Sequence, residues 1–496
     1  MILNRFAMRH DARRAGALDD DPHRGRSSRT APLLSVCIVW GTMGMAFALP
    51  RQASPKTAPA LAGQVTPQAR EFILQGFELL GQHNAVEAEK VFRQAIEAQP
   101  EAEPAHRGLG LALREQGRLA EAFRELQTAT QLDPSDADAH YSLGTVAWTL
   151  SVTESSSPGK AGALGASDYQ NLAGAEFSRA LALSPKDATL RMNLAMLYLD
   201  SDRAREARQQ AEEAVRIAPD SAPAHLVLGR ADFAGGEEDK AAQEFEAAVK
   251  LDPHDGGAYL ALGQLRLFQH RLPQAEEALR RAIEISPNLG PANAALAQIL
   301  ATQGKTSQAR SLLEKSVNLD PQDWQSQYQL AVLLNQAGES ARATELLEKV
   351  LRANPDFPGA REQMAASMLR RGDAKGATSL AESMIAKDPP GPEGHRIMAL
   401  ALWKQRDYEG SLAEAALALA PDPDSSSMLT LQAIALWQLG RKKDSQMAFR
   451  AAAKVEPQVT SADVFCRLML CDQHDIAMVS EFLHKNRWVL APPPEP

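Results

Sequence analysis

The sequence is poor in cysteine and in aromatic residues. Only three of its 496 residues are Cys, and Phe, Trp and Tyr together make up 5%. Three cysteines cannot supply the disulfide framework on which small extracellular folds depend. With so few aromatic side chains, Ala and Leu must fill the interior, and both residues lose little conformational freedom on entering a helix. The composition therefore favours helices over sheets.

The sequence also lacks an excess of positive charge and the short motifs of common enzymes. Its formal net charge is −9, which argues against a protein that binds nucleic acid through its backbone, because such proteins need a basic face. There is no P-loop, G-x-S-x-G, H-E-x-x-H or dinucleotide-binding fingerprint. We therefore predict a protein that is not an enzyme, with no catalytic residue, no cofactor and no metal site.

Long apolar runs are absent except near the start of the chain. Residues 1–30 carry seven Arg, an interrupted apolar run covers residues 31–49, and the run ends in the small-x-small pattern Ala46-Phe47-Ala48. This order is typical of a secretory signal peptide, and cleavage would leave Leu49 first. The alternative is an uncleaved inner-membrane anchor, because the run is at the lower limit for spanning a bilayer. Both interpretations of residues 1–48 predict a periplasmic or exported protein.

Proline recurs with a period of 34 residues. Every interval is 34 except one, which is 17 longer, and a small residue usually stands five and twelve positions before each Pro, with a large one eight before it. Those three offsets share one face of a helix. A mid-unit Gly would end a first helix and allow the turn into a second. The prolines lie at 100, 134, 185, 219, 253, 287, 321, 355, 389, 423 and 457, and the glycines at 117, 236, 304, 338, 372 and 440.

A 34-residue helix–turn–helix unit of this kind resembles the tetratricopeptide-repeat family. About eleven units cover residues 69–459, after a Pro/Ala-rich linker over 49–68. The resemblance implies an all-α, right-handed superhelical solenoid in which the first helix of each unit lines the concave side. We expect the 17 extra residues, within 151–167, to form a flexible loop in the third unit. Residues 460–496 should form a C-terminal helical cap and a disordered tail.

The resemblance also implies that ligands face positions 2, 5, 9, 12 and 13 of each unit. Large side chains at these positions predict an apolar wall that binds other proteins or extended peptides, and the alternative is that they pack inside the helix array. The candidate residues are Phe77, Leu111, Tyr141, Trp148, Met192, Met196, Phe233, Tyr328, Trp403 and Trp437.

Three hypotheses for function follow. The first is a noncatalytic protein- or peptide-binding scaffold outside the cytoplasm. The second is an accessory component of envelope assembly or polysaccharide export. The third is a regulatory partner of a glycosyltransferase system. In all three the partners are proteins rather than nucleic acid, and the N-terminal segment engages the membrane during export or as an anchor.

Four histidines share the fourth position of their units, where the family pattern has an aromatic residue. They are His106, His140, His225 and His395. A metal ion needs nitrogens about 2 Å away, whereas equivalent positions in adjacent units lie roughly two helix spacings of about 8–10 Å apart. We expect them to be ordinary helix-start histidines.

Two cysteines lie five residues apart near the C-terminus. On one continuous helix Cys466 and Cys471 would point about 140° apart, which is poor geometry for a disulfide. We therefore expect buried free thiols, with a disulfide as the alternative in an oxidising compartment.

Overall fold

The computed structural model describes residues 65–156, 164–355, 357, 359–471 and 473–486. The predicted signal or anchor, most of the linker and the C-terminal tail lie outside these residues. The chain divides after Ala295 into two compact bodies. We call residues 65–295 the first body and residues 296–486 the second body, and describe each by itself. The described residues contain helices and no strand, which confirms the all-α prediction.

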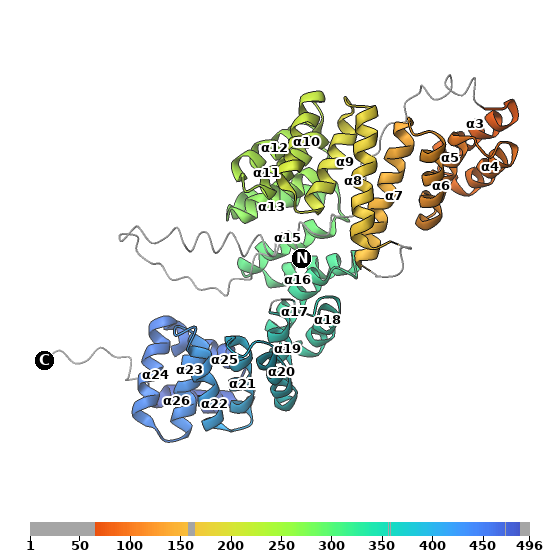
Figure 1. Ribbon diagram of the computed structural model, residues 1–496. Coiled ribbons are helices and arrows are strands. Elements are labelled where there is room, and N and C mark those ends of the chain that lie inside the picture. The colour runs from red at the N-terminus through yellow and green to blue at the C-terminus, as the bar shows by residue number, and fades with distance from the viewer. Residues whose placement is uncertain (1–64, 157–163, 356, 358, 472, 487–496) are drawn as a thin grey trace. The chain divides into compact units, whose positions relative to one another are not determined.

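In the first body each unit consists of two consecutive helices that pack against each other (Figure 1). The first helices are α3 (Pro67–Gly81), α5 (Glu103–Glu115), α7 (Ala137–Ser156), α9 (Ala188–Asp200), α11 (Ala222–Ala234) and α13 (Gly256–Phe268). The second helices are α4 (Ala85–Ala98), α6 (Leu119–Leu132), α8 (Ala166–Leu183), α10 (Ala204–Ile217), α12 (Glu238–Leu251) and α14 (Leu272–Ile285).

The second body repeats this pattern, and the division between the bodies falls within α15 (Gly290–Thr302). Its first helices are α17 (Trp324–Gln336), α19 (Ala360–Arg370), α21 (Pro392–Lys404) and α23 (Ser426–Gln438). Its second helices are α16 (Thr306–Leu319), α18 (Ser340–Ala353), α20 (Ala374–Lys387), α22 (Tyr408–Leu419) and α24 (Lys442–Val455). Helices α3 to α24 thus supply two helices for each of the eleven predicted units.

A left-handed residue ends the first helix in ten of the eleven units. All six predicted mid-unit glycines have φ between 74° and 83°, a backbone region that glycine adopts without a steric penalty. Four other units place a different residue in the same left-handed conformation. These are His83, Asp202, His270 and Arg406.

The third unit lacks this stop. Its equivalent position is Ser151, which stays helical and donates its hydroxyl to the carbonyl of Trp148 at 2.7 Å. The helix therefore continues to Ser156, and α8 begins already at Ala166. The prediction of a loop over 151–167 was too long, because much of the insertion lengthens the two helices; residues 157–163 lie outside the described residues.

The predicted small and large residues of the second helices form part of the core. Phe92, Leu126, Phe177 and Phe245 are fully buried. Each large residue packs against a glycine of its own first helix or the next one. A Cβ atom added to Gly229, for example, would lie 2.6 Å from the ring of Phe245, so only glycine fits at this crossing.

Two further helices follow the last repeat of the second body, within the range expected to hold a C-terminal helical cap. After a 3₁₀ turn (η1, Pro457–Thr460) come α25 (Ala462–Met469) and α26 (Gln473–Asn486). Phe482 of α26 lies 5.6 Å from Trp437 and 5.1 Å from Phe449, measured between ring centroids. Within the described ranges, no helix is both long enough and apolar enough to cross a bilayer.

Candidate protein-binding surface

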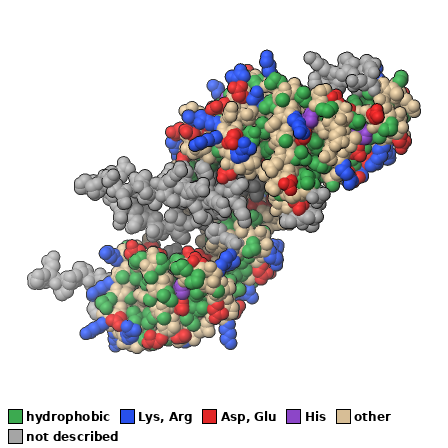
Figure 2. Space-filling view, in the orientation of Figure 1, with side chains coloured by type: hydrophobic (Ala, Val, Ile, Leu, Met, Phe, Trp, Pro, Cys, Tyr) green, Lys and Arg blue, Asp and Glu red, His purple; other side chains and the backbone are tan. Residues whose placement is uncertain are grey.

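The first helices form one layer in each body. In the first body α9 contacts α11 and α11 contacts α13, whereas second helices of neighbouring units make no contacts of that extent. One side of each first helix packs on its second helix, and the opposite side is left uncovered by the second helices. We call this side of α5, α7, α9, α11 and α13 the first-helix face. On the side of the molecule seen in Figure 2, acidic and basic side chains are interspersed.

Five of the ten predicted wall residues are buried. Trp148 is 1% exposed and Trp403 is not exposed at all. Both occupy position 12, which is four residues from the glycine position that faces the second helix. Four steps of 100° bring a side chain back to within about 40° of that buried direction, so these side chains pack inside the helix array. The other three buried residues are Tyr141, Met192 and Phe233.

The remaining five candidates are half-buried, and aromatic side chains pack against three of them, including Tyr328, whose ring centroid lies 4.8 Å from that of Phe357. Phe77 packs edge-on against Phe92, with the guanidinium of Arg107 5.3 Å from the centre of its ring. Trp437 is covered by the cap helix α26 through Phe482. The half-buried residues are Phe77, Leu111, Met196, Tyr328 and Trp437, and their role in binding stays a prediction.

A line of polar groups crosses the first-helix face from α7 to α13. The indole N–H of Trp148 donates to Oδ2 of Asp200 at 2.9 Å. Asp200 interacts electrostatically with Arg230 of α11, which interacts in turn with Asp255 at the start of α13. Burial raises the pKa of Asp200 to about 6, although the Trp148 indole and the positive charge of Arg230 oppose this rise. The charged groups of Asp200 and Arg230 are therefore partly removed from solvent.

Apolar side chains lie directly beside this charged pair. Met196 is one helical turn before Asp200 on α9, and Leu226 is one turn before Arg230 on α11, so each shares a helix side with its charged neighbour. Met196 and Leu226 are both half-buried. We define the α9–α11 patch as Met196, Asp200, Leu226 and Arg230. It offers apolar surface and two opposite charges to a ligand.

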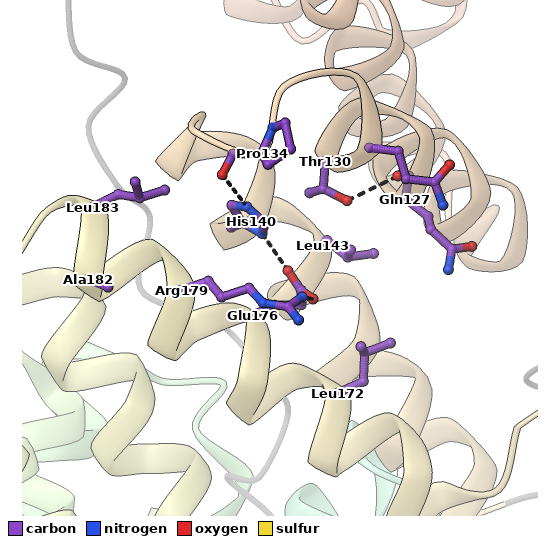
Figure 3. Close-up of a pocket in the computed structure, with 11 residues that line it drawn as sticks. Gln127, Thr130, Pro134, His140, Leu143, Leu172, Glu176, Arg179, Ala182 and Leu183 are labelled. Carbon is purple, nitrogen blue, oxygen red and sulfur yellow. Dashed lines mark hydrogen bonds and ion pairs between the residues drawn. The ribbon is translucent and has the colours of Figure 1, made fainter.

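A second candidate is a hollow of about 640 Å³ between α6, α7 and α8, shown in Figure 3. Leu143, Leu172 and Leu183 line it together with His140 and Glu176. Glu176 accepts hydrogen bonds from His140 and from Arg179, each at 2.5 Å. The polar groups of His140 and Glu176 are hydrogen-bonded to each other, so a structural role accounts for both residues and no ligand is required in the hollow.

The four histidines at position four bind the turn that precedes the first helix of their own unit. Nε2 of His140 donates to the carbonyl oxygen of Pro134 at 3.0 Å, while Nδ1 contacts Glu176; dashed lines mark both contacts in Figure 3. We call this arrangement the loop staple. His106, His225 and His395 make the same two contacts, with a proline carbonyl and a Glu of the second helix. In another unit Gln327 donates to the Pro321 carbonyl at 2.7 Å.

The staples predict a pH dependence of stability. Burial disfavours the charged ring of His395, but the bonds to Glu414 and to the Pro389 carbonyl outweigh burial and raise its pKa above the usual value. A raised pKa contributes stability that is complete below about pH 6.5 and is lost as the pH rises through the folded-state value. The variant His395→Gln has the side chain that Gln327 supplies in another unit, so it should keep a hydrogen bond to the Pro389 carbonyl. Because Gln does not titrate, this variant should lose the contribution of residue 395 to the pH dependence of stability.

The measurement is the thermal midpoint of both proteins at about pH 5.5 and about pH 8.5, where the histidine changes charge. The midpoint difference between wild type and His395→Gln should be larger at the lower pH. An equal difference at both values would show that the charge of His395 adds nothing to the staple.

Sequence reasoning missed the charged residues of the α9–α11 patch. Asp200 and Arg230 occupy positions 13 and 9, which belong to the ligand-facing set but were searched for large apolar residues only. A signal was available. Position 13 lies five steps, or about 140°, from the buried glycine direction, so a charged residue there, next to an Arg at position 9 of the following unit, marks the uncovered side.

Comparison with known proteins agrees with the repeat architecture. Residues 110–150 match the family described as "TPR repeat", and residues 163–231, 201–265, 232–299 and 300–367 match "Tetratricopeptide repeat". No curated protein matches the chain.

Several solved structures are similar to parts of the chain. A tetratricopeptide repeat protein from Parabacteroides merdae ATCC 43184 is 16% identical, with a TM-score of 0.44, over 58% of this chain and 100% of its own. MamA is 19% identical, with a TM-score of 0.32, over 38% and 94%. YrrB, described as a TPR protein with an unusual peptide-binding site, is 22% identical, with a TM-score of 0.30, over 38% and 96%.

Proposed function

Because the chain is built of tetratricopeptide repeats, we propose that it is a noncatalytic scaffold that binds another protein through the α9–α11 patch. The observation that carries this proposal is the placement of half-buried Met196 and Leu226 beside the Asp200–Arg230 charges. Apolar side chains that are partly exposed to solvent beside charged side chains favour a ligand that makes both apolar and charged contacts.

The patch suits an extended segment of a partner protein. Met196 and Asp200 follow one helix, Leu226 and Arg230 the next, so a segment lying across α9 and α11 meets an apolar side chain and then a charge on each. Arg230 would contact a carboxylate of the segment, and Asp200 a basic or amide group. An aliphatic or aromatic side chain would fill the space between Met196 and Leu226.

Substitution of the patch tests the proposal. Met196→Glu and Leu226→Glu place a carboxylate where the partner's apolar side chain would lie, so binding should weaken by at least about tenfold. Val86→Glu and Leu417→Glu are matched controls, because these side chains are 55% and 51% exposed on second helices. Partners captured by the wild type and confirmed by direct titration provide the readout.

The control variants should bind like the wild type, and circular dichroism should show that all four proteins are folded. Loss of binding in the controls, or full binding in both patch variants, would contradict the proposed surface.

We also propose that the scaffold works outside the cytoplasm, on the basis of the basic start, the apolar run over 31–49 and the Ala46-Phe47-Ala48 pattern. A role in envelope assembly or polysaccharide export is the more specific version of this proposal. N-terminal sequencing of the protein from fractionated cells should give a chain that starts at Leu49. An intact N-terminus in the membrane fraction would support the anchor instead.

A regulatory partner of a glycosyltransferase system is the remaining alternative. It predicts that the captured partner turns over a sugar nucleotide and that its rate changes when the scaffold is added. A captured partner without such activity would remove this alternative and leave the scaffold proposal standing.

A further inference from the structure

The end of α25 brings the side chains of two cysteines together. Leu470 has a φ of 52°, in the left-handed region, and ends the helix, after which the N–H of Cys471 donates to the carbonyl of Cys466 at 3.0 Å. A bond of this span around a left-handed residue is a Schellman motif, which is frequently accompanied by a contact between the side chains of the two bonded residues. The thiols of Cys466 and Cys471 lie close enough to shift each other's pKa.

This geometry corrects the expectation from the sequence. An angle of about 140° between the cysteines applies only if the helix continues through both residues, and it ends before Cys471. With standard backbone dimensions, the 3.0 Å hydrogen bond keeps the two Cα atoms within about 7 Å of each other. Disulfides join Cα atoms that are about 4.4–6.8 Å apart, so only a small adjustment is required.

We propose that Cys466 and Cys471 form an oxidation site, which closes to an intramolecular disulfide in the folded chain. Both thiols are free and half-buried in the structure, so a small oxidant can approach them. This inference goes beyond the scaffold function, since it concerns the C-terminal cap of the second body and requires no partner protein.

The surroundings assign different roles to the two sulfur atoms. The hydrogen bond from Cys471 lowers the pKa of Cys466, assisted by the positive charge of Lys404 and opposed by burial and by the carboxylates of Asp475 and Asp463. The same hydrogen bond and burial raise the pKa of Cys471. Cys466 is therefore the first nucleophile, because the thiolate is the reactive form.

The reaction is a thiol–disulfide exchange with an external disulfide, such as oxidised glutathione or the disulfide of a thiol oxidase. The Cys466 thiolate attacks one sulfur of that disulfide, forms a mixed disulfide and releases one thiolate. Cys471 then gives its proton to solvent and attacks the sulfur of Cys466, which closes the intramolecular bond and releases the second thiolate. The two protein thiols are oxidised, and the external disulfide is reduced to two thiols.

The bond would fix the connection between α25 and α26. Asp475, four residues after Cys471, forms an ion pair with Lys404 of α21, and Phe482 packs against Trp437. A covalent link just before these contacts should make the closed cap more resistant to unfolding, because a bond that forms more readily in the folded state must stabilise that state.

Equilibration of the full chain in glutathione redox buffers tests this proposal. The fraction of the Cys466–Cys471 disulfide is measured by peptide mass spectrometry, in native buffer and in urea. The native chain should form the bond at a ratio of reduced to oxidised glutathione at least about tenfold higher than the unfolded chain does, since folding holds the thiols together. Its thermal midpoint should rise on oxidation.

Cys471→Ser is the matched control, and its thermal midpoint should not depend on the redox buffer. Leu470→Gly should keep the response, because glycine adopts a positive φ freely. An equal or greater tendency to form the bond in urea would overturn the proposal. Accumulation of glutathione on Cys466 without closure by Cys471 would overturn it as well. Neither result bears on binding at the α9–α11 patch.

Discussion

Replacing Trp148 by Ala should lower the free energy of unfolding of the first body by about 3–5 kcal/mol, the usual cost of emptying a buried aromatic site. Trp148 is 1% exposed. Its ring packs edge-on against Phe177 at 6.2 Å, and its indole N–H donates to Asp200 at 2.9 Å. The substitution removes the packing and also leaves the partly buried Asp200 carboxylate without its donor, and both losses act in the same direction.

Trp148→Phe separates the two contributions. It keeps most of the ring and removes only the donor, so we expect a smaller loss of about 1–3 kcal/mol and a further rise in the pKa of Asp200, which burial already places at about 6. Urea unfolding followed by circular dichroism gives the free energy of unfolding of the wild type and of both variants. A loss below about 1 kcal/mol for Trp148→Ala would show that the side chain is not part of the core.

Replacing Lys404 by Met should destabilise the second body by about 3–5 kcal/mol, the range for removing one partner of a buried ion pair. The side chain of Lys404 is 7% exposed and that of its partner Asp475 is 1% exposed. Without Lys404, the Asp475 carboxylate would remain buried, with the guanidinium of Arg406 at 3.5 Å as its nearest cation. The cap helix α26 should therefore detach first, and its amides should exchange faster.

The double variant Lys404→Met with Asp475→Leu tests the physical reason. When both charges are absent, no uncompensated charge stays buried, so most of the lost stability should return. Urea midpoints of the wild type, both single variants and the double variant give the coupling free energy. A double variant as unstable as the sum of the single variants would mean that the two side chains act independently.

The repeat architecture was accessible from the sequence because it depends on local chemistry. The proline period, the small and large residues of the second helices and the left-handed glycines each act within one unit, and Gly117 and Phe177 took their predicted roles. The same reasoning failed where a local signal was absent. Ser151 stands where other units have a stop residue, and its presence inside a longer helix shows that the insertion continues α7.

The candidate surface was harder to predict because exposure depends on neighbouring units. Positions 12 and 13 are adjacent in sequence, yet the side chain at position 12 turns toward the second helix and the one at position 13 turns away. Trp148 and Trp403 are consequently buried, whereas Asp200 interacts with Arg230 on the neighbouring helix. The contact between Cys466 and Cys471 also required the point at which α25 ends, which the sequence alone did not reveal.

Hydrogen exchange of the full chain with and without a captured partner tests the central claim most directly. If the partner binds across the α9–α11 patch, amides of Ala188–Asp200 and Ala222–Ala234 should exchange more slowly in the complex, while those of α10 and α12 should change little. Protection confined to the second helices, or to α25 and α26, would contradict the account and place the binding surface elsewhere.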